Sequence, residues 1–97
     1  MKFMVCWEIH PDKRQDVMTI FASMELADYK ALSGPKITIH GRWHDVINMT
    51  GFVLGEAENV GDMARWLNQW HTVCDFEIVP VMEDEEAHAI AREMYPS

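Results

Sequence analysis

The pattern of hydrophobic and polar residues predicts a β-strand in each of four segments of the chain. Residues 2 to 9, KFMVCWEI, mix apolar, aromatic and β-branched types without Gly or Pro, which is typical of a strand buried on both faces. Residues 36 to 44, KITIHGRWH, alternate strictly and predict a one-sided edge strand. Residues 51 to 57, GFVLGEA, and 75 to 82, DFEIVPVM, predict two more strands. Pro80 places the last of them at an edge, because proline cannot donate to a ladder.

Two other segments have the three-to-four-residue spacing of amphipathic helices. The first helix is expected to open at Pro11 and to end before Gly34, although residues 25 to 34 also fit a loop. Its apolar stripe, which we expect to face a sheet, consists of Val17, Ile20, Phe21, Met24 and Ala31. The second helix is expected to be capped by Asn59. Its stripe consists of Met63, Trp66, Leu67 and Trp70. A short helix over 84 to 94, with an acidic first turn, should follow the last strand.

The order of these elements is β-α-β-β-α-β with a C-terminal helix. This order is typical of the ferredoxin-like α+β fold, in which a four-stranded antiparallel sheet carries two helices on one face. The 97 residues are expected to form a single domain, 1 to 97. A hairpin should join the second and third strands across residues 45 to 51, which contain Asn48 and Gly51.

Two helices cover only one face of such a sheet, yet both faces carry apolar residues. Along the first strand, Phe3, Val5 and Trp7 alternate with Met4 and Cys6. Soluble monomers rarely expose a large apolar patch. We therefore expect a homodimer that forms through the uncovered sheet faces, most simply with twofold symmetry.

Composition narrows the classes of function. Sixteen acidic and eight basic residues give a formal net charge of -8, and the largest basic cluster is Lys13-Arg14, so nucleic acid is not an expected partner. The first apolar run is broken at Glu8, short of a secretory signal, and no later run approaches the ~20 residues of a membrane span. Cys6 and Cys74 are expected to stay reduced. We therefore expect a soluble, cytoplasmic protein with no membrane partner, metal or cofactor.

The sequence HGRWHD, residues 40 to 45, contains the candidate catalytic residues. Strict alternation places His40, Arg42 and His44 on one face of the strand, and the sequence leaves open whether this is the uncovered face of the sheet. The planar guanidinium of Arg42 is suited to hold a carboxylate, phosphate or enolate. Either histidine is suited to act as a general base or hydrogen-bond partner near neutral pH. In a continuous strand the two histidines lie ~13 Å apart, too far to bind one metal ion.

Five further residues are candidates for ligand binding. They are Glu8, Trp43, Glu56, Trp66 and Trp70. Trp66 and Trp70 lie one turn apart and would wall a slot between the second helix and the sheet. Two interpretations of this region are open. In the first it lines a small-molecule cavity; in the second Arg42 pairs with a glutamate in an interface, and the tryptophans belong to the core.

The chain also resembles a known family, domain of unknown function 3303. The resemblance is carried by WEIHPDKR at 7 to 14, GRWHD at 41 to 45, GFVLGEA at 51 to 57, ARWLNQW at 64 to 70 and DFEIVPV at 75 to 81. It spans nearly the whole chain and implies a dimeric α+β barrel, in which two ferredoxin-like subunits press their sheets together. Similar proteins of that superfamily include cofactor-independent monooxygenases, haem-degrading oxygenases, chlorite dismutases, and small isomerases or decarboxylases. For a haem-degrading activity the nearest candidates would be His71 and Trp66, although no haem signature accompanies them.

Two hypotheses of function follow. The first is a homodimer that binds a small organic ligand near the GRWH strand, with an isomerase-like or cofactor-independent monooxygenase-like reaction as its enzymatic form. The second is a non-catalytic accessory or interaction dimer with no bound ligand. A cavity of ~300 Å3 lined by the GRWH residues would favour the first.

Overall fold

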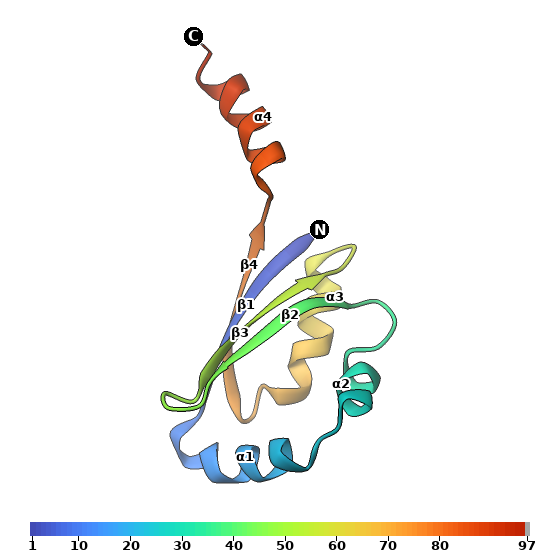
Figure 1. Cartoon of the computed structure of the whole chain (residues 1–97), viewed down its shortest axis with the longest axis vertical. Coiled ribbons are helices and arrows are strands. Elements are labelled where there is room, and N and C mark those ends of the chain that lie inside the picture. Colours follow the sequence, from blue (N-terminus) through green and yellow to red (C-terminus); the bar gives the residue numbers. More distant parts are fainter. Residues whose placement is uncertain (97) are drawn as a thin grey trace.

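The computed structural model describes residues 1 to 96 and contains one antiparallel sheet with helices on one side (Figure 1). In chain order the elements are β1 (Lys2–Ile9), η1 (Pro11–Lys13), α1 (Arg14–Ser23), α2 (Leu26–Ser33), β2 (Thr38–Asp45), β3 (Thr50–Glu56), α3 (Val60–Leu67), η2 (Asn68–Trp70), β4 (Cys74–Val81) and α4 (Asp84–Met94). The strand order is β2-β3-β1-β4. The predicted ferredoxin-like α+β fold is confirmed, and β2 and β4 are its edge strands, as expected.

The core lies between the sheet and α3. Phe3 and Val5 of β1 are buried on the side that faces the helices, where Val5 pairs with Val53 of β3. The predicted stripe of the second helix supplies three buried residues, Met63, Trp66 and Leu67. The core cluster comprises Phe3, Val5, Ile37, Val53, Ala57, Met63, Trp66 and Leu67. The side chain of Asn59 accepts a hydrogen bond from the Asp62 amide at 2.9 Å, which confirms the predicted cap.

The segment between β1 and β2 forms two helices where the sequence predicted one helix or a helix and a loop. Met24 has an extended backbone, and a capping box between Glu25 and Asp28 starts α2 immediately afterwards. Neither α1 nor α2 contains a fully buried residue, and Ile20 of the predicted stripe is 63% exposed. The stripe therefore faces the sheet, as expected, but it does not pack closely on the strands. Space is left between these helices and the sheet.

A β-bulge at His40 breaks the alternation predicted for residues 36 to 44. Ile39 pairs with Gly55 and Gly41 with Leu54, so His40 is an extra residue between two paired positions. An insertion of one residue moves every later side chain to the opposite face. Arg42 and His44 therefore lie on the helix-covered side, and the prediction that they share one face with His40 is wrong.

The other face of the sheet is left uncovered by the part of the chain that the structure describes, residues 1 to 96 (Figure 1). The split predicted for β1 is confirmed, since Met4 and Cys6 face away from the core and pair with Leu54 and Phe52 of β3. Phe52 is 47% exposed on this face. We call this surface the open face. In Figure 1, α4 leaves the end of β4 and projects beyond the sheet without covering either face.

Candidate functional site

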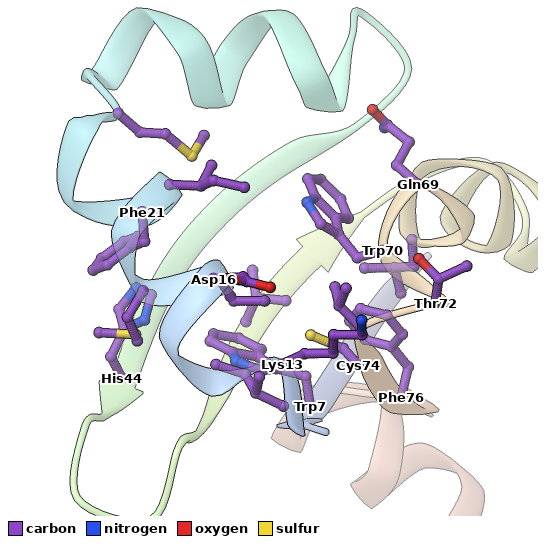
Figure 2. Close-up of a pocket in the computed structure, with 18 of the residues that line it drawn as sticks. Trp7, Lys13, Asp16, Phe21, His44, Gln69, Trp70, Thr72, Cys74 and Phe76 are labelled. Carbon is purple, nitrogen blue, oxygen red and sulfur yellow. The ribbon is translucent and has the colours of Figure 1, made fainter. Parts of the chain in front are cut away.

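A cavity of about 440 Å3 lies between the helix-covered side of the sheet and the helices that cross it. Figure 2 shows Phe21 and His44 at one side of the cavity, with Trp70 and Phe76 at the opposite side. Most of the lining is apolar, and the volume falls within the ~300 to 1,000 Å3 typical of small-molecule sites. The space left under α1 is thus a candidate binding site.

Arg42 brings a positive charge into this cavity. The bulge at His40 directs Arg42 to the helix side, where its guanidinium carbon lies 4.5 Å from the centroid of the Tyr29 ring. Within residues 1 to 96, none of the ion pairs involves Arg42, so a pairing with a glutamate of the same chain is not formed. Burial lowers the pKa of Arg42, since no carboxylate compensates for the lost water. The cavity therefore contains a cationic group without an ion-pair contact among residues 1 to 96, although the Asp16 carboxylate also lines it.

His44 lies beside Arg42 among aromatic rings. Its ring centroid is 4.8 Å from that of Phe21 and 5.3 Å from that of Trp7. Burial, followed by the positive charge of Arg42, lowers the pKa of His44. The neutral imidazole is therefore the form favoured at neutral pH, and it is able to accept a proton from a bound molecule.

The remaining candidates on the strands lie on the open face, away from the cavity. His40 Nε2 is 2.6 Å from Glu56 Oε1, and this contact lowers the pKa of Glu56. Glu8 and Trp43 share this face, and Trp43 is 56% exposed. The structure therefore divides the predicted set. Arg42, His44, Trp66 and Trp70 line the cavity, whereas Glu8, His40, Trp43 and Glu56 do not.

The cavity also contains residues that we did not predict as part of a site. They include Trp7, Lys13, Asp16, Phe21, Tyr29 and Cys74. Tyr29 falls in the stretch whose structure the pattern left open, so its contact with Arg42 had no local signal. Trp66 and Trp70 stand nearly perpendicular, at 87°, and form a corner of the wall. The buried Nε1 of Trp66 has no hydrogen-bond partner among residues 1 to 96.

The described residues do not form a ligand set for a metal ion or for haem. Across residues 1 to 96, no group of three or more His, Cys, Asp or Glu side chains is placed to hold a metal ion. His71 lies outside the cavity lining, and its Nδ1 is 2.8 Å from the carbonyl oxygen of Asn68. It does not fit the role of a haem ligand in this cavity. Cys6 and Cys74 are both free thiols.

No helix within residues 1 to 96 has both the length and the apolar character needed to cross a membrane.

Comparison with known families agrees with the resemblance seen in the sequence. A family model described as "Domain of unknown function (DUF3303)" matches residues 1–95. The chain belongs to this family. The match covers all four strands of the DUF3303 protein, every residue that lines the cavity, and α4. A search of curated proteins found no match, and a search of solved structures also found none.

We expect two histidines of this DUF3303 protein to titrate on opposite sides of the ordinary histidine pKa of about 6.5. A hydrogen bond to Asp75, with His10 Nε2 2.9 Å from Asp75 Oδ1, raises the pKa of His10. Burial lowers the pKa of His44. NMR spectra of the imidazole resonances between about pH 5 and pH 8 measure both values. A His44 that titrates at or above His10 would contradict its position in the cavity.

The lowered pKa of His44 also predicts how stability changes with pH. The unfolded chain binds this proton more readily than the folded one, so the contribution of His44 is complete above about pH 6.5 and is lost as the pH falls through its folded pKa. His44→Phe removes the titrating group. On acidification from about pH 7.5 to about pH 5, urea unfolding should show a larger loss of stability for the wild type than for His44→Phe. Equal losses would argue against a lowered pKa of His44 in the folded chain.

Gly51 allows the Trp7 indole to lie flat against β3 in the cavity wall. A methyl group at Gly51 would overlap ring atoms of Trp7, so Gly51→Ala forces this ring to move. We expect a loss of about 1 to 3 kcal/mol in the free energy of unfolding, together with a reshaped cavity. Gly61→Ala is the control, because its methyl group would come no closer than 3.2 Å to the side chains of Asn59 and Arg65 and would meet no ring. Thermal unfolding compares the two, and equal effects would refute the packing role of Gly51.

Proposed function

We propose that the DUF3303 protein binds a small organic anion in the cavity under α1, with Arg42 as the anchor for the anionic group. The observation that carries this proposal is the guanidinium of Arg42, which sits within an aromatic cavity and has no carboxylate partner among the described residues. Burying a charge without a partner costs free energy. A ligand that supplies the opposite charge removes this cost and gains charge-assisted hydrogen bonds.

The rest of the wall supports a ligand with an apolar, and preferably aromatic, body. Trp7, Phe21 and Trp70 line the cavity together with several aliphatic side chains, and such surfaces favour flat rings through stacked or edge contacts. The unpartnered Nε1 of Trp66 is a buried donor, which a ligand oxygen is suited to satisfy. An aromatic carboxylate, or an enol of similar shape, combines the two features.

His44 extends the proposal from binding to chemistry. A neutral imidazole beside a cation is suited to take an acidic proton from a ligand whose anionic form Arg42 stabilises. Proton abstraction of this kind starts isomerisation and also activates enolisable substrates for cofactor-independent oxygenation. The enzymatic form of the proposal assigns His44 as the base and Arg42 as the electrostatic stabiliser.

We also propose that the protein is a homodimer that associates through the open face. Phe52, Leu54 and Met4 lie together there, and the exposed Trp43 extends the apolar surface along β2. A second copy with the same face is the simplest cover. Each copy would keep its own cavity on the opposite side of the sheet. This surface also supports the second candidate function, an accessory dimer without a ligand.

A matched pair of probes tests the binding proposal directly. Indole-3-acetate and indole-3-acetamide have the same aromatic body, but only the first is an anion. Isothermal titration calorimetry should show at least roughly tenfold tighter binding of the acetate, a difference of about 1.4 kcal/mol. Chemical-shift changes should centre on Arg42, His44 and Trp66. Equal affinities would refute the anchor role of Arg42, and no binding by either probe would favour the accessory dimer.

A further inference from the structure

Within residues 1 to 96, the C-terminal helix α4 has no packing partner that would account for its stability. All its residues are exposed apart from the half-buried Ile90, and Figure 1 shows the helix extending away from the sheet and from the other helices. Isolated helices shorter than about 12 to 15 residues are marginal in water, and α4 has 11 residues. No side chain caps its N-terminus. Its folding therefore requires contacts with another surface.

The sequence of α4 places apolar residues along one stripe. Ala87, Ile90, Ala91 and Met94 fall within about 100° of one another on a helix of 3.6 residues per turn. Ala89 lies on the opposite side, among the charged residues. Met94 is 64% exposed. A helix with this pattern is suited to pack along an apolar surface through a single face.

The open face of the sheet is the surface that continues into α4. Val79 and Val81 of β4 point to the open face, and Met82 follows them at the junction with the helix. These three residues are all partly exposed. One apolar surface thus runs from the open face, along the end of β4, to the start of the C-terminal arm, which we define as residues 82 to 94.

The connection between β4 and α4 disfavours folding of the arm back over the open face of its own sheet. Lys2 forms an ion pair with Glu83, and Lys2 also pairs with Val81 in the ladder between β1 and β4. To cover its own open face, the chain would have to reverse within Met82 and Glu83 and break the ion pair. A second copy requires no such reversal. It also has the same two unpartnered surfaces, an open face and an arm.

We propose that α4 is an exchanged arm, which packs through its apolar stripe on a second copy of the chain beside the open face. This inference rests on the homodimer proposed above and adds a second element to its interface. The arm would gain its helical structure on association, so dimer formation and folding of residues 84 to 94 would be coupled.

Two alanines provide a matched pair of substitutions for this inference. Ala87→Asp places a carboxylate on the apolar stripe, whereas Ala89→Asp places the same group on the charged side of the same helix. Sedimentation velocity over a concentration series should show that Ala87→Asp raises the dissociation constant of the dimer at least roughly tenfold. The dissociation constant of Ala89→Asp should stay close to that of the wild type. Similar behaviour of the two variants would overturn the exchanged arm.

A spin-label experiment identifies which chain the arm contacts. Arg92→Cys, in full-length protein with Cys6 and Cys74 replaced by alanine, carries a nitroxide label near the end of the arm. Unlabelled isotope-enriched protein is then mixed with spin-labelled protein of natural isotope content. Broadening of sheet amides in the enriched copies would support the exchange.

The alternatives give different outcomes. Broadening only when label and isotope share one chain would show a folded-back arm and overturn the inference. An intact dimer without broadening in either sample would also overturn it, while leaving the proposed dimer in place. A wild type that stays monomeric at every concentration would overturn both the arm and the dimer.

Discussion

Replacement of Arg42 by methionine should weaken binding of an aromatic carboxylate such as indole-3-acetate by about 100-fold, which corresponds to about 2.7 kcal/mol. The substitution keeps an apolar chain of similar length but removes the group proposed to hold the anion. The same change should leave the melting temperature equal or slightly raised. It removes an unpaired, half-buried charge, and this gain offsets the lost contact with Tyr29.

The combination of these two effects separates a binding residue from a structural one. A residue that supports the fold lowers both stability and affinity when it is removed, whereas a residue retained for its ligand lowers affinity alone. Calorimetric titration and thermal unfolding of the same sample measure the two quantities. Lys30→Met is the control, because it makes the same change in net charge at an exposed position outside the cavity. A fall of ten degrees in the melting temperature of Arg42→Met, roughly 1 to 2 kcal/mol, would indicate a structural role.

Most of the fold was predictable because the signals that specify it are local. The apolar runs of β1 and β3, the stripe on α3 and the cap at Asn59 each depend on residues within one element. Once these elements are placed in order, few topologies remain, and the observed sheet is one of them. The consecutive apolar residues of β1 also showed in the sequence that both faces of this strand are apolar.

The side on which Arg42 lies was not predictable in this way. The letters from Lys36 to His44 alternate without a break, and only the pairing of β2 with β3 shows that His40 is an extra residue. Register depends on a partner strand, and a shift of one residue exchanges the two faces. Gly41 was the available signal, because glycine inside a strand often marks a bulge.

The cavity itself also lay beyond the sequence pattern. The stripe through Val17, Phe21 and Met24 predicts that this side of the helix faces a sheet, and these side chains line an open volume between the helix and the sheet. Periodicity shows which side of a helix avoids water. It does not show whether protein atoms or a ligand fill the space that the helix faces. The break at Met24, which lets α2 turn and bring Tyr29 toward Arg42, depends on the capping box that follows it.

Leu54→Asp should convert the proposed dimer into a folded monomer. Leu54 lies on the open face between β1 and β2, where it pairs with Met4 and Gly41. In a twofold dimer the substitution occurs twice, and a buried carboxylate at a well-packed site costs about 2 kcal/mol or more each time. The expected total of about 4 kcal/mol weakens association roughly 1,000-fold. Sedimentation velocity across a concentration series measures this change, and circular dichroism shows whether the monomer stays folded.

The matched control for this substitution is Ile47→Asp. Ile47 is 84% exposed in the turn between β2 and β3, so the new charge stays in water and association should not change. Leu54 is only half-buried in the single chain. In the monomer the new carboxylate at position 54 is therefore able to reach solvent, so the variant should still fold. If Leu54→Asp associates as strongly as the wild type, the open face is not the interface.

Arg42→Met and Leu54→Asp also test whether the cavity and the interface are independent. Arg42 and Leu54 lie on opposite faces of the same sheet, so the proposed cavity and the proposed interface share no wall. The Leu54→Asp monomer should therefore bind indole-3-acetate with an affinity close to that of the dimer, and Arg42→Met should dimerise normally. A monomer that has lost its ligand would show that the second copy shapes the cavity through the sheet. Independent effects would instead establish one complete binding site in each copy of the chain.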